Sequence, residues 1–219
     1  MASPPEPRPR KPLLRGVSHQ VAALVAIVGW FALVVNASGA RARVAALVYG
    51  GCLVALFAAS ALYHRPDWSP GPYRWMRRID HSSIYLLIAG TYTPICLLLA
   101  DGRARWTLAL VWVAAGLGVA MAMAWPTAPK ALRTAVYLAM GWGALPLVPE
   151  LAARLGGRGL LLLAGGGALY TVGAIIYATR RPDPFPRVFG YHEIFHAFVV
   201  AAAALHFTVA MDVVRALGV

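Results

Sequence analysis

The sequence predicts an all-α integral membrane protein, a bundle of seven transmembrane helices with its N-terminus in the cytoplasm and its C-terminus outside. Three observations predict this class. Hydrophobic residues make up 60% of the 219 residues and charged residues only 13%, where a soluble domain carries about 25%. The mean hydropathy is +0.65. The apolar residues also fall into runs of about 20, the length that crosses a bilayer as a helix. Disorder and a disulfide-rich secreted fold are therefore excluded.

Seven apolar runs follow a polar N-terminal segment. Residues 1–16 hold five Pro and four Lys or Arg, so we expect a disordered, basic cytoplasmic tail before one membrane domain at residues 17–219. The expected spans are residues 17–35, 44–63, 79–100, 106–125, 134–148, 160–178 and 192–214. The first run also resembles a signal peptide, but six further runs favour a retained helix. We expect a multi-pass protein of the plasma membrane, with the lipid bilayer as its surroundings.

The fifth run is the shortest, and residues that break helices lie in or beside it. Gly141, Gly143, Pro146 and Pro149 occur there within nine residues. Such a segment is typical of a kinked or partly unwound helix that packs within protein, because a freed backbone group facing lipid has no partner.

The distribution of positive charge predicts the orientation. With the N-terminus inside, residues 1–16, 65–78, 126–133 and 179–191 face the cytoplasm. These segments hold 13 of the 20 Lys and Arg, and cytoplasmic loops carry the excess of positive residues. The net charge of +12 is thus spread over short loops rather than gathered on one stripe, and we expect no nucleic-acid partner.

Five of the six histidines lie at run ends that this orientation places near the cytoplasmic face. They are His19, His64, His81, His192 and His196. The sixth, His206, lies ten residues beyond His196, about 15 Å deeper along the same helix. Polar side chains in a span are costly and usually functional, so this convergence predicts a site near the cytoplasmic face.

His192 and His196 stand four residues apart, on one face of a helix, where they can share a metal ion. The segment His192-Glu193-Ile194-Phe195-His196 matches H-E-x-x-H, in which the glutamate of soluble zincins is the general base. Here Glu193 lies at the membrane boundary and can equally face headgroups or a loop arginine. The two histidines can also be interfacial residues that only bind water. With His64 as a third imidazole and no thiolate nearby, the set predicts Zn²⁺ with an open coordination position.

Ser60 and Asp80 are the candidate catalytic residues beside these histidines. Ser60 lies one turn deeper than His64 on the same face, where its hydroxyl could hold a metal-bound water or orient a carboxylate. Its alternative role is a hydrogen bond within its own helix. Asp80 could accept the proton of the water, or it could cap the helix that starts beside it. His81 points about 100° away from Asp80 and is expected to meet solvent or headgroups.

Four blocks of this sequence resemble the bacterial hemolysin III family. They are Ser60 to His64 (S-A-L-Y-H), Asp80 to Tyr85 (D-H-S-S-I-Y), Ala89 to Pro94 (A-G-T-Y-T-P) and His192 to His196 (H-E-I-F-H), with His206 beyond. That family is related to the progestin and adipoQ receptors and more distantly to alkaline ceramidases. The resemblance implies seven helices, an inner N-terminus and a zinc ion held by His64, His192 and His196. Asp80 and Ser60 would contact the zinc-bound water, and His206 would not be a ligand.

The family name implies membrane lysis, while the wider superfamily implies zinc-dependent hydrolysis of lipid amides or esters, with ceramide-like amides as the obvious substrate class. The open three-histidine site favours the hydrolase, because such a site suits chemistry better than structure. One alternative is a pore-forming or lytic protein in which zinc is structural, and a second is a receptor-like lipid sensor without turnover. A hydrolase predicts an apolar cavity that opens from the zinc into the bundle, lined by Leu, Val and Phe. It also predicts a polar mouth near residues 65–78 or 179–191, where Arg77, Arg78 and Arg187 could hold an anion. The sequence identifies no particular protein partner and leaves that question open.

Overall fold

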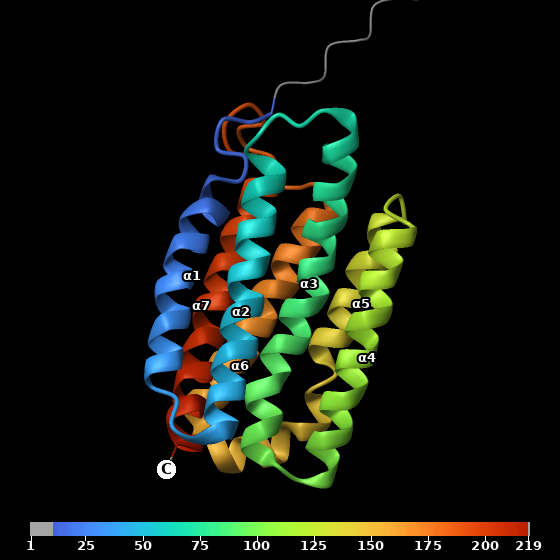
Figure 1. Cartoon of the computed structure of the whole chain (residues 1–219). Helices are drawn as coiled ribbons and strands as arrows, with labels where there is room; N and C mark the ends of the chain where they lie inside the picture. Colours follow the sequence, from blue (N-terminus) through green and yellow to red (C-terminus); the bar gives the residue numbers. More distant parts are fainter. Residues whose placement is uncertain (1–10, 219) are drawn as a thin grey trace, which may run out of the picture.

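The computed structural model describes residues 11–218, which form a bundle of helices that run along a common axis (Figure 1). The helices in chain order are α1 (Val17–Val35), α2 (Gly39–His64), α3 (Pro70–Leu99), α4 (Gly102–Ala124), α5 (Lys130–Trp142), the 3₁₀ helix η1 (Leu145–Leu147), α6 (Val148–Thr179) and α7 (Tyr191–Leu217). The described part of the chain contains no β-strand.

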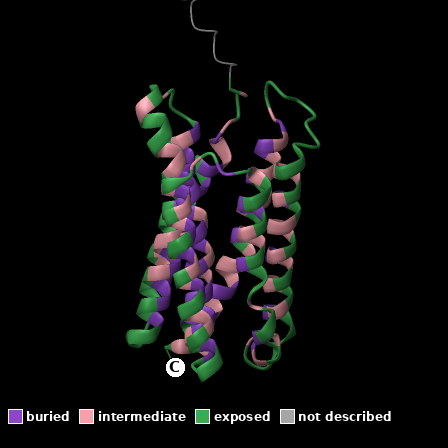
Figure 2. Ribbon diagram, turned by 90° about the vertical axis from the view of Figure 1, so that its right-hand side faces the viewer, coloured by how far each residue is buried: buried purple, intermediate pink, exposed green. Residues whose placement is uncertain are grey.

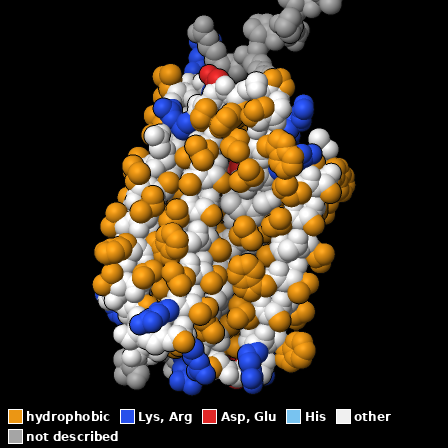
Figure 3. All heavy atoms as spheres, in the orientation of Figure 1, with side chains coloured by type: hydrophobic (Ala, Val, Ile, Leu, Met, Phe, Trp, Pro, Cys, Tyr) orange, Lys and Arg blue, Asp and Glu red, His pale blue; other side chains and the backbone are white. Residues whose placement is uncertain are grey.

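Within residues 11–218, six helical segments are long and apolar enough to cross a membrane: α1, α2, α3, α4, the stretch Lys130–Thr179, and α7. Large apolar side chains point outward, such as Val28 and Phe31 of α1, which are 69% and 70% exposed. In the space-filling view apolar side chains cover the flank, and Lys and Arg lie mainly near the two ends (Figure 3). A protein with this surface needs lipid around it, and the predicted all-α membrane bundle is confirmed.

The fifth segment is broken, as its Gly and Pro residues predict. α5 has only 13 residues and ends at Trp142. Pro146 and Pro149 are the second residues of η1 and α6, within the first turn, where a missing N–H is tolerated. α6 is then interrupted at Gly156, whose φ of 64° favours glycine. α5 alone is too short to cross a bilayer.

α3 begins nine residues earlier than its predicted span. Residues 65–78 were expected to be a loop, but the helix starts at Pro70, whose fixed φ suits a first helical position. The polar residues of this first section extend beyond the apolar run, so hydropathy alone could not find them. As a result, Asp80 lies well inside α3 and does not cap it.

The last residues of the expected tail are ordered. The backbone N–H groups of Leu13 and Leu14 donate to the carbonyls of Arg187 and Val188, each at 3.1 Å. Lys11 forms an ion pair with Asp67 at 3.0 Å. The segment from residue 11 to residue 16 therefore joins the loops at this end of the bundle, while residues 1–10 of the predicted tail lie outside the described residues.

Two groups of buried apolar residues hold the bundle together, one mainly among α1, α2 and α7 and the other among α3, α4, α5, η1 and α6. Buried residues line the inside of the helices and exposed residues their outer faces (Figure 2). Small residues allow close approach, as is usual in membrane bundles. Gly118 of α4, for example, lies directly against the Tyr85 ring of α3.

Substituting valine for Gly118 should destabilise the bundle, because a side chain there would overlap the Tyr85 ring. We expect a loss of about 1–3 kcal/mol, the usual cost of overpacking. Gly116 is the matched control, since a side chain there meets open space. Thermal unfolding in detergent should give a lower Tm for Gly118→Val than for Gly116→Val. Equal midpoints would show that α3 and α4 do not pack in this way.

Candidate metal centre

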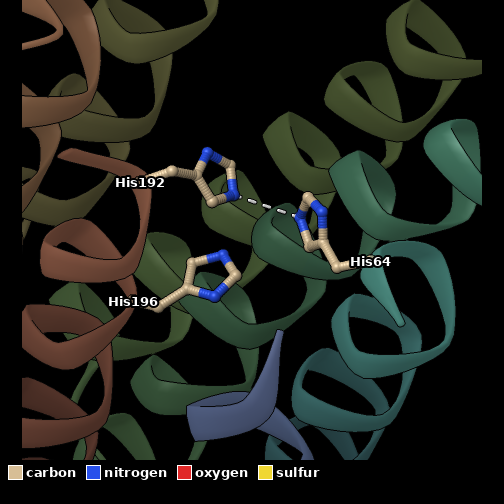
Figure 4. A group of neighbouring side chains, drawn as sticks. All are labelled: His64, His192 and His196. Carbon is tan, nitrogen blue, oxygen red and sulfur yellow. Dashed lines mark hydrogen bonds between the residues drawn. The ribbon is translucent and has the colours of Figure 1, made fainter. Parts of the chain in front are cut away.

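His64, His192 and His196 converge at the end of the bundle where α2 ends and α7 begins (Figure 4). The three side chains are buried, with 9%, 9% and 2% of their surface exposed. One nitrogen from each ring lies within 4.8 Å of the others, and His64 Nε2 and His192 Nε2 are 3.2 Å apart. The spacing in sequence thus predicted a real cluster.

The donor set fits a metal ion. Two imidazole nitrogens on a tetrahedral zinc lie about 3.3 Å apart when each Zn–N bond is about 2.0–2.1 Å, which agrees with the 3.2 Å between His64 and His192. His196 Nδ1 is buried and has no hydrogen-bond partner among residues 11–218. The burial of these side chains is evidence against the alternative that the histidines are interfacial residues that only bind water. The group could therefore hold a metal ion.

His19 supports the cluster, although its sequence position alone gave it no role. Its ring stacks on His196 with centroids 3.7 Å apart and planes 6° apart. Its other neighbour is Phe57, in an edge contact at 5.1 Å. This packing fixes the plane of the His196 ring. Its place at the start of the first predicted span indicated that it lies at the same depth as the ligands. Because His19 is on a different helix, no spacing along the sequence could show that it contacts His196.

Glu193 does not face the cluster as a free base. Its side chain is buried, and one carboxylate oxygen pairs with Arg15 Nε. The other oxygen accepts the backbone N–H of Gly190 at 2.8 Å, which caps the start of α7. Both oxygens are therefore occupied, and Glu193 fixes the first turn that carries His192 and His196. The general-base role of the H-E-x-x-H pattern does not apply.

Asp80 and Ser60 lie in the wall of the same cavity as the three histidines. Both are buried, and the Ser60 hydroxyl lies beside the Asp80 carboxylate. Because α3 starts at Pro70, Asp80 is a carboxylate in mid-helix rather than a cap. A carboxylate within a membrane bundle is costly and marks a functional position. Ser60 of α2 and Asp80 of α3 thus face the same cavity as His64.

His81 was expected to meet solvent or headgroups, and this expectation is wrong. Its side chain is buried and lines the cavity, and its carbonyl oxygen accepts a hydrogen bond from Tyr137 at 3.3 Å. Tyr137 belongs to α5, so α5 covers the face that a loop was expected to leave open. His206 lies apart from the cluster, with Nε2 donating to the Leu163 carbonyl at 3.1 Å.

A cavity of about 780 Å³ extends from the three histidines into the bundle. On α6 its wall runs from Leu160 to Tyr177, about 25 Å at 1.5 Å per residue. Far from the histidines the wall is mostly apolar, with residues such as Ile95, Leu145 and Leu163. Near them it is polar and basic. Of the three expected mouth arginines, Arg77 lines this cavity, while Arg78 and Arg187 are not among the lining residues.

These features define a multi-pass α-helical membrane protein with a three-histidine centre at one end of an internal cavity. The chain belongs to the haemolysin-III related family, which matches residues 8–207. It is 34% identical over 202 residues to Hemolysin-3 of Bacillus cereus, covering 90% of this chain and 89% of that protein. It is 33% identical to the Hemolysin-3 homolog of Bacillus subtilis (strain 168), with 90% and 92% covered.

A human protein also matches. The monocyte to macrophage differentiation factor of Homo sapiens is 29% identical over 173 residues, which cover 75% of this chain and 68% of that protein. The match supports the relationship between hemolysin III and the progestin and adipoQ receptors that the sequence motifs indicate.

Removing two of the three imidazoles should remove the metal ion. We expect about one metal ion per purified chain, and a loss of more than ~10-fold in His64→Ala plus His196→Ala, since one imidazole cannot replace a three-ligand site. His206→Ala is the control, because this residue lines the cavity outside the cluster. Elemental analysis after gel filtration checks both. Full retention in the double variant would show that the metal lies elsewhere.

Proposed function

We propose that this chain is a zinc-dependent membrane hydrolase that cleaves an amide or ester bond of a lipid. One observation carries the proposal: the three buried histidines stand at the polar end of a long cavity whose remainder is mostly apolar. An acyl chain can lie in the apolar part while its amide or ester bond reaches the histidines. A site that only fastened two helices together would need no such cavity.

Zinc is the proposed metal because three imidazoles without a thiolate suit it and leave a coordination position open for chemistry. When bound, zinc acts as a Lewis acid that polarises a carbonyl group and lowers the pKa of water. His64 comes from α2 and the other two ligands from α7, so the packing of these helices sets the ligand positions.

Asp80 is the proposed general base. Its carboxylate accepts a proton from the attacking water as the water oxygen bonds to the carbonyl carbon. It returns the proton to the leaving nitrogen or oxygen as the C–N or C–O bond breaks, which releases a fatty acid and an amine or alcohol. Ser60 lies beside Asp80, and its proposed role is to donate a hydrogen bond that orients the carboxylate. Glu193 and His19 keep α7 and the His196 ring in place.

The proposed topology has seven crossings, with the N-terminus and the metal centre on the cytoplasmic side of the plasma membrane. Residues 130–155 form the fifth crossing, in which α5, η1 and the first part of α6 follow one another before the break at Gly156. The charge asymmetry supports this orientation, since 13 of the 20 Lys and Arg then face the cytoplasm.

The orientation predicts which loops can be labelled from outside the cell. We start from a chain without its two free cysteines, Cys52 and Cys96, each replaced by alanine. Asp67→Cys places a thiol in the loop between α2 and α3, and Gly102→Cys places one at the first residue of α4; both positions are exposed. A maleimide that does not cross membranes should label position 102 in intact cells, and position 67 only after lysis. The opposite pattern would invert the topology.

Neutralising Asp80 should lower turnover without releasing the metal. We expect hydrolysis to fall by about 10²-fold or more in Asp80→Asn, in line with the loss of a general base, while metal content stays unchanged. The matched control is Asp101→Asn, because Asp101 caps α4 and asparagine caps equally well. The assay measures fatty-acid release from a panel of lipid amides and esters, with and without a chelator. Loss of metal in Asp80→Asn would instead make Asp80 a ligand.

The second candidate function is lysis, which the name Hemolysin-3 of two relatives favours. The histidine cluster would then only join α2 to α7. Ion leakage from protein-containing liposomes separates the candidates. A hydrolase predicts tight liposomes and products that vanish on chelation. Leakage that survives replacement of His192, without turnover across the panel, would support lysis. Lipid binding with neither turnover nor leakage would support a receptor-like sensor.

A further inference from the structure

A second polar centre lies at the mouth of the cavity, beside the histidines. Arg77, Lys130 and Arg133 all line the cavity there. None of the three forms an ion pair among residues 11–218. Among residues 11–218, the only carboxylate in the wall of this cavity belongs to Asp80. The mouth thus carries an excess of positive charge.

Arg133 shows this excess most clearly, because its side chain is only 4% exposed. Its Nη1 donates to the carbonyls of Ala128 at 2.8 Å and Pro126 at 3.2 Å. These bonds hold the guanidinium in place but do not neutralise it. A buried charge normally has a counter-ion, and within the described residues no carboxylate supplies one.

The start of α5 adds to the positive potential. The helix has Pro129 at its N-cap, no side-chain cap and no acidic residue in its first turn. Its first N–H groups and its dipole present positive charge at this end. Helices normally place acidic residues there, yet Lys130 and Arg133 occupy the first turn. This arrangement opposes the stability of α5 unless an anion lies beside it.

Aromatic side chains hold the ammonium group and add hydrogen-bond donors. Lys130 Nζ lies 4.7 Å from the centre of the Tyr177 ring and 5.9 Å from that of Tyr191, which favours a fixed cation. Tyr63 and Tyr73, whose hydroxyls are 2.9 Å apart, also line the cavity. Phenolic hydroxyls can donate to the oxygens of an anion.

The preference for positive residues on the cytoplasmic side does not explain this cluster. Arg65 and Arg74 satisfy that preference, since both are exposed and neither lines the cavity. The positive-inside rule concerns only an excess of Lys and Arg in short cytoplasmic loops. It does not require burial of Arg133, nor cations in the wall of a cavity whose far end is apolar.

We propose that the mouth binds the phosphate group of an anionic lipid whose acyl chain occupies the cavity. Three cations and an open helix N-terminus match the charge of a phosphate monoester, about −1.5 to −2, and its three acceptor oxygens. The proposal rests on the proposed function in one respect: it names the substrate class, an acyl lipid with a phosphate headgroup whose amide or ester bond lies at the metal centre.

The test is a binding measurement on the purified full chain in detergent, by native mass spectrometry. The probes are lysophosphatidic acid, a monoacylglycerol with the same chain, and glycerol phosphate. We expect lysophosphatidic acid to bind at least ~10-fold more tightly than either of the others, because only it fills both parts of the cavity. Lys130→Gln plus Arg77→Gln should reduce this preference to below ~3-fold.

Arg105→Gln is the control, since this exposed arginine lies in the first turn of α4, at the opposite end of the bundle. The Arg105→Gln variant should keep the full preference for lysophosphatidic acid over the other two probes. Arg133→Gln is included only if its Tm matches that of the wild type. Chelator-treated protein should also keep the preference, which separates the basic mouth from an anion held by the metal.

Equal binding of lysophosphatidic acid and monoacylglycerol by the wild type would overturn the proposal. If glycerol phosphate bound as tightly as lysophosphatidic acid, the mouth would be a site for a soluble phosphate compound, and the proposal that the ligand is a lipid would be overturned. A preference unchanged in Lys130→Gln plus Arg77→Gln would also overturn it. Failure of the hydrolase proposal looks different: no lipid is cleaved, while the preference for the phosphate lipid and its loss in the double variant remain.

Discussion

The packing of α2 against α7 is the interaction on which the site depends. His64 ends one helix, and His192 and His196 begin the other, so the three rings meet only if the two helices lie together with this register. Both helices contribute small residues to one buried apolar cluster, such as Ala42 and Ala45 of α2 and Ala203 and Ala210 of α7. In a bilayer, where apolar burial gives little driving force between helices, small residues let the backbones approach closely and so hold a bundle together.

The first turn of α7 is fixed from outside the bundle as well. Arg15 pairs with Glu193, and Glu193 caps the helix through Gly190. The segment just before α1 therefore acts on the helix that carries two of the three histidines. This coupling gives the glutamate of the H-E-x-x-H pattern a structural place, since its two oxygens hold the start of the helix.

The sequence was sufficient for the parts of the structure that follow from local patterns. The bounds of α1 match the predicted run 17–35, and the i, i+4 spacing of His192 and His196 placed them on one face. Contacts between helices could not be predicted from the sequence. The stacking of His19 on His196 and the covering of His81 by α5 depend on tertiary packing, which no spacing along one helix encodes. The early start of α3 at Pro70 was missed because its first turns are polar.

Electrostatics links the two polar centres of the cavity. A dication at the histidines would repel the nearby Lys130, Arg133 and Arg77. Within residues 11–218, Asp80 is the only carboxylate lining the cavity that can offset this repulsion. Interactions inside a membrane bundle are weakly screened, so the repulsion acts over several ångströms. An anion at the mouth would reduce it and so strengthen metal binding. By linkage, the metal would strengthen anion binding by the same factor, so that an anionic lipid would be held most firmly in the form of the protein that carries its metal.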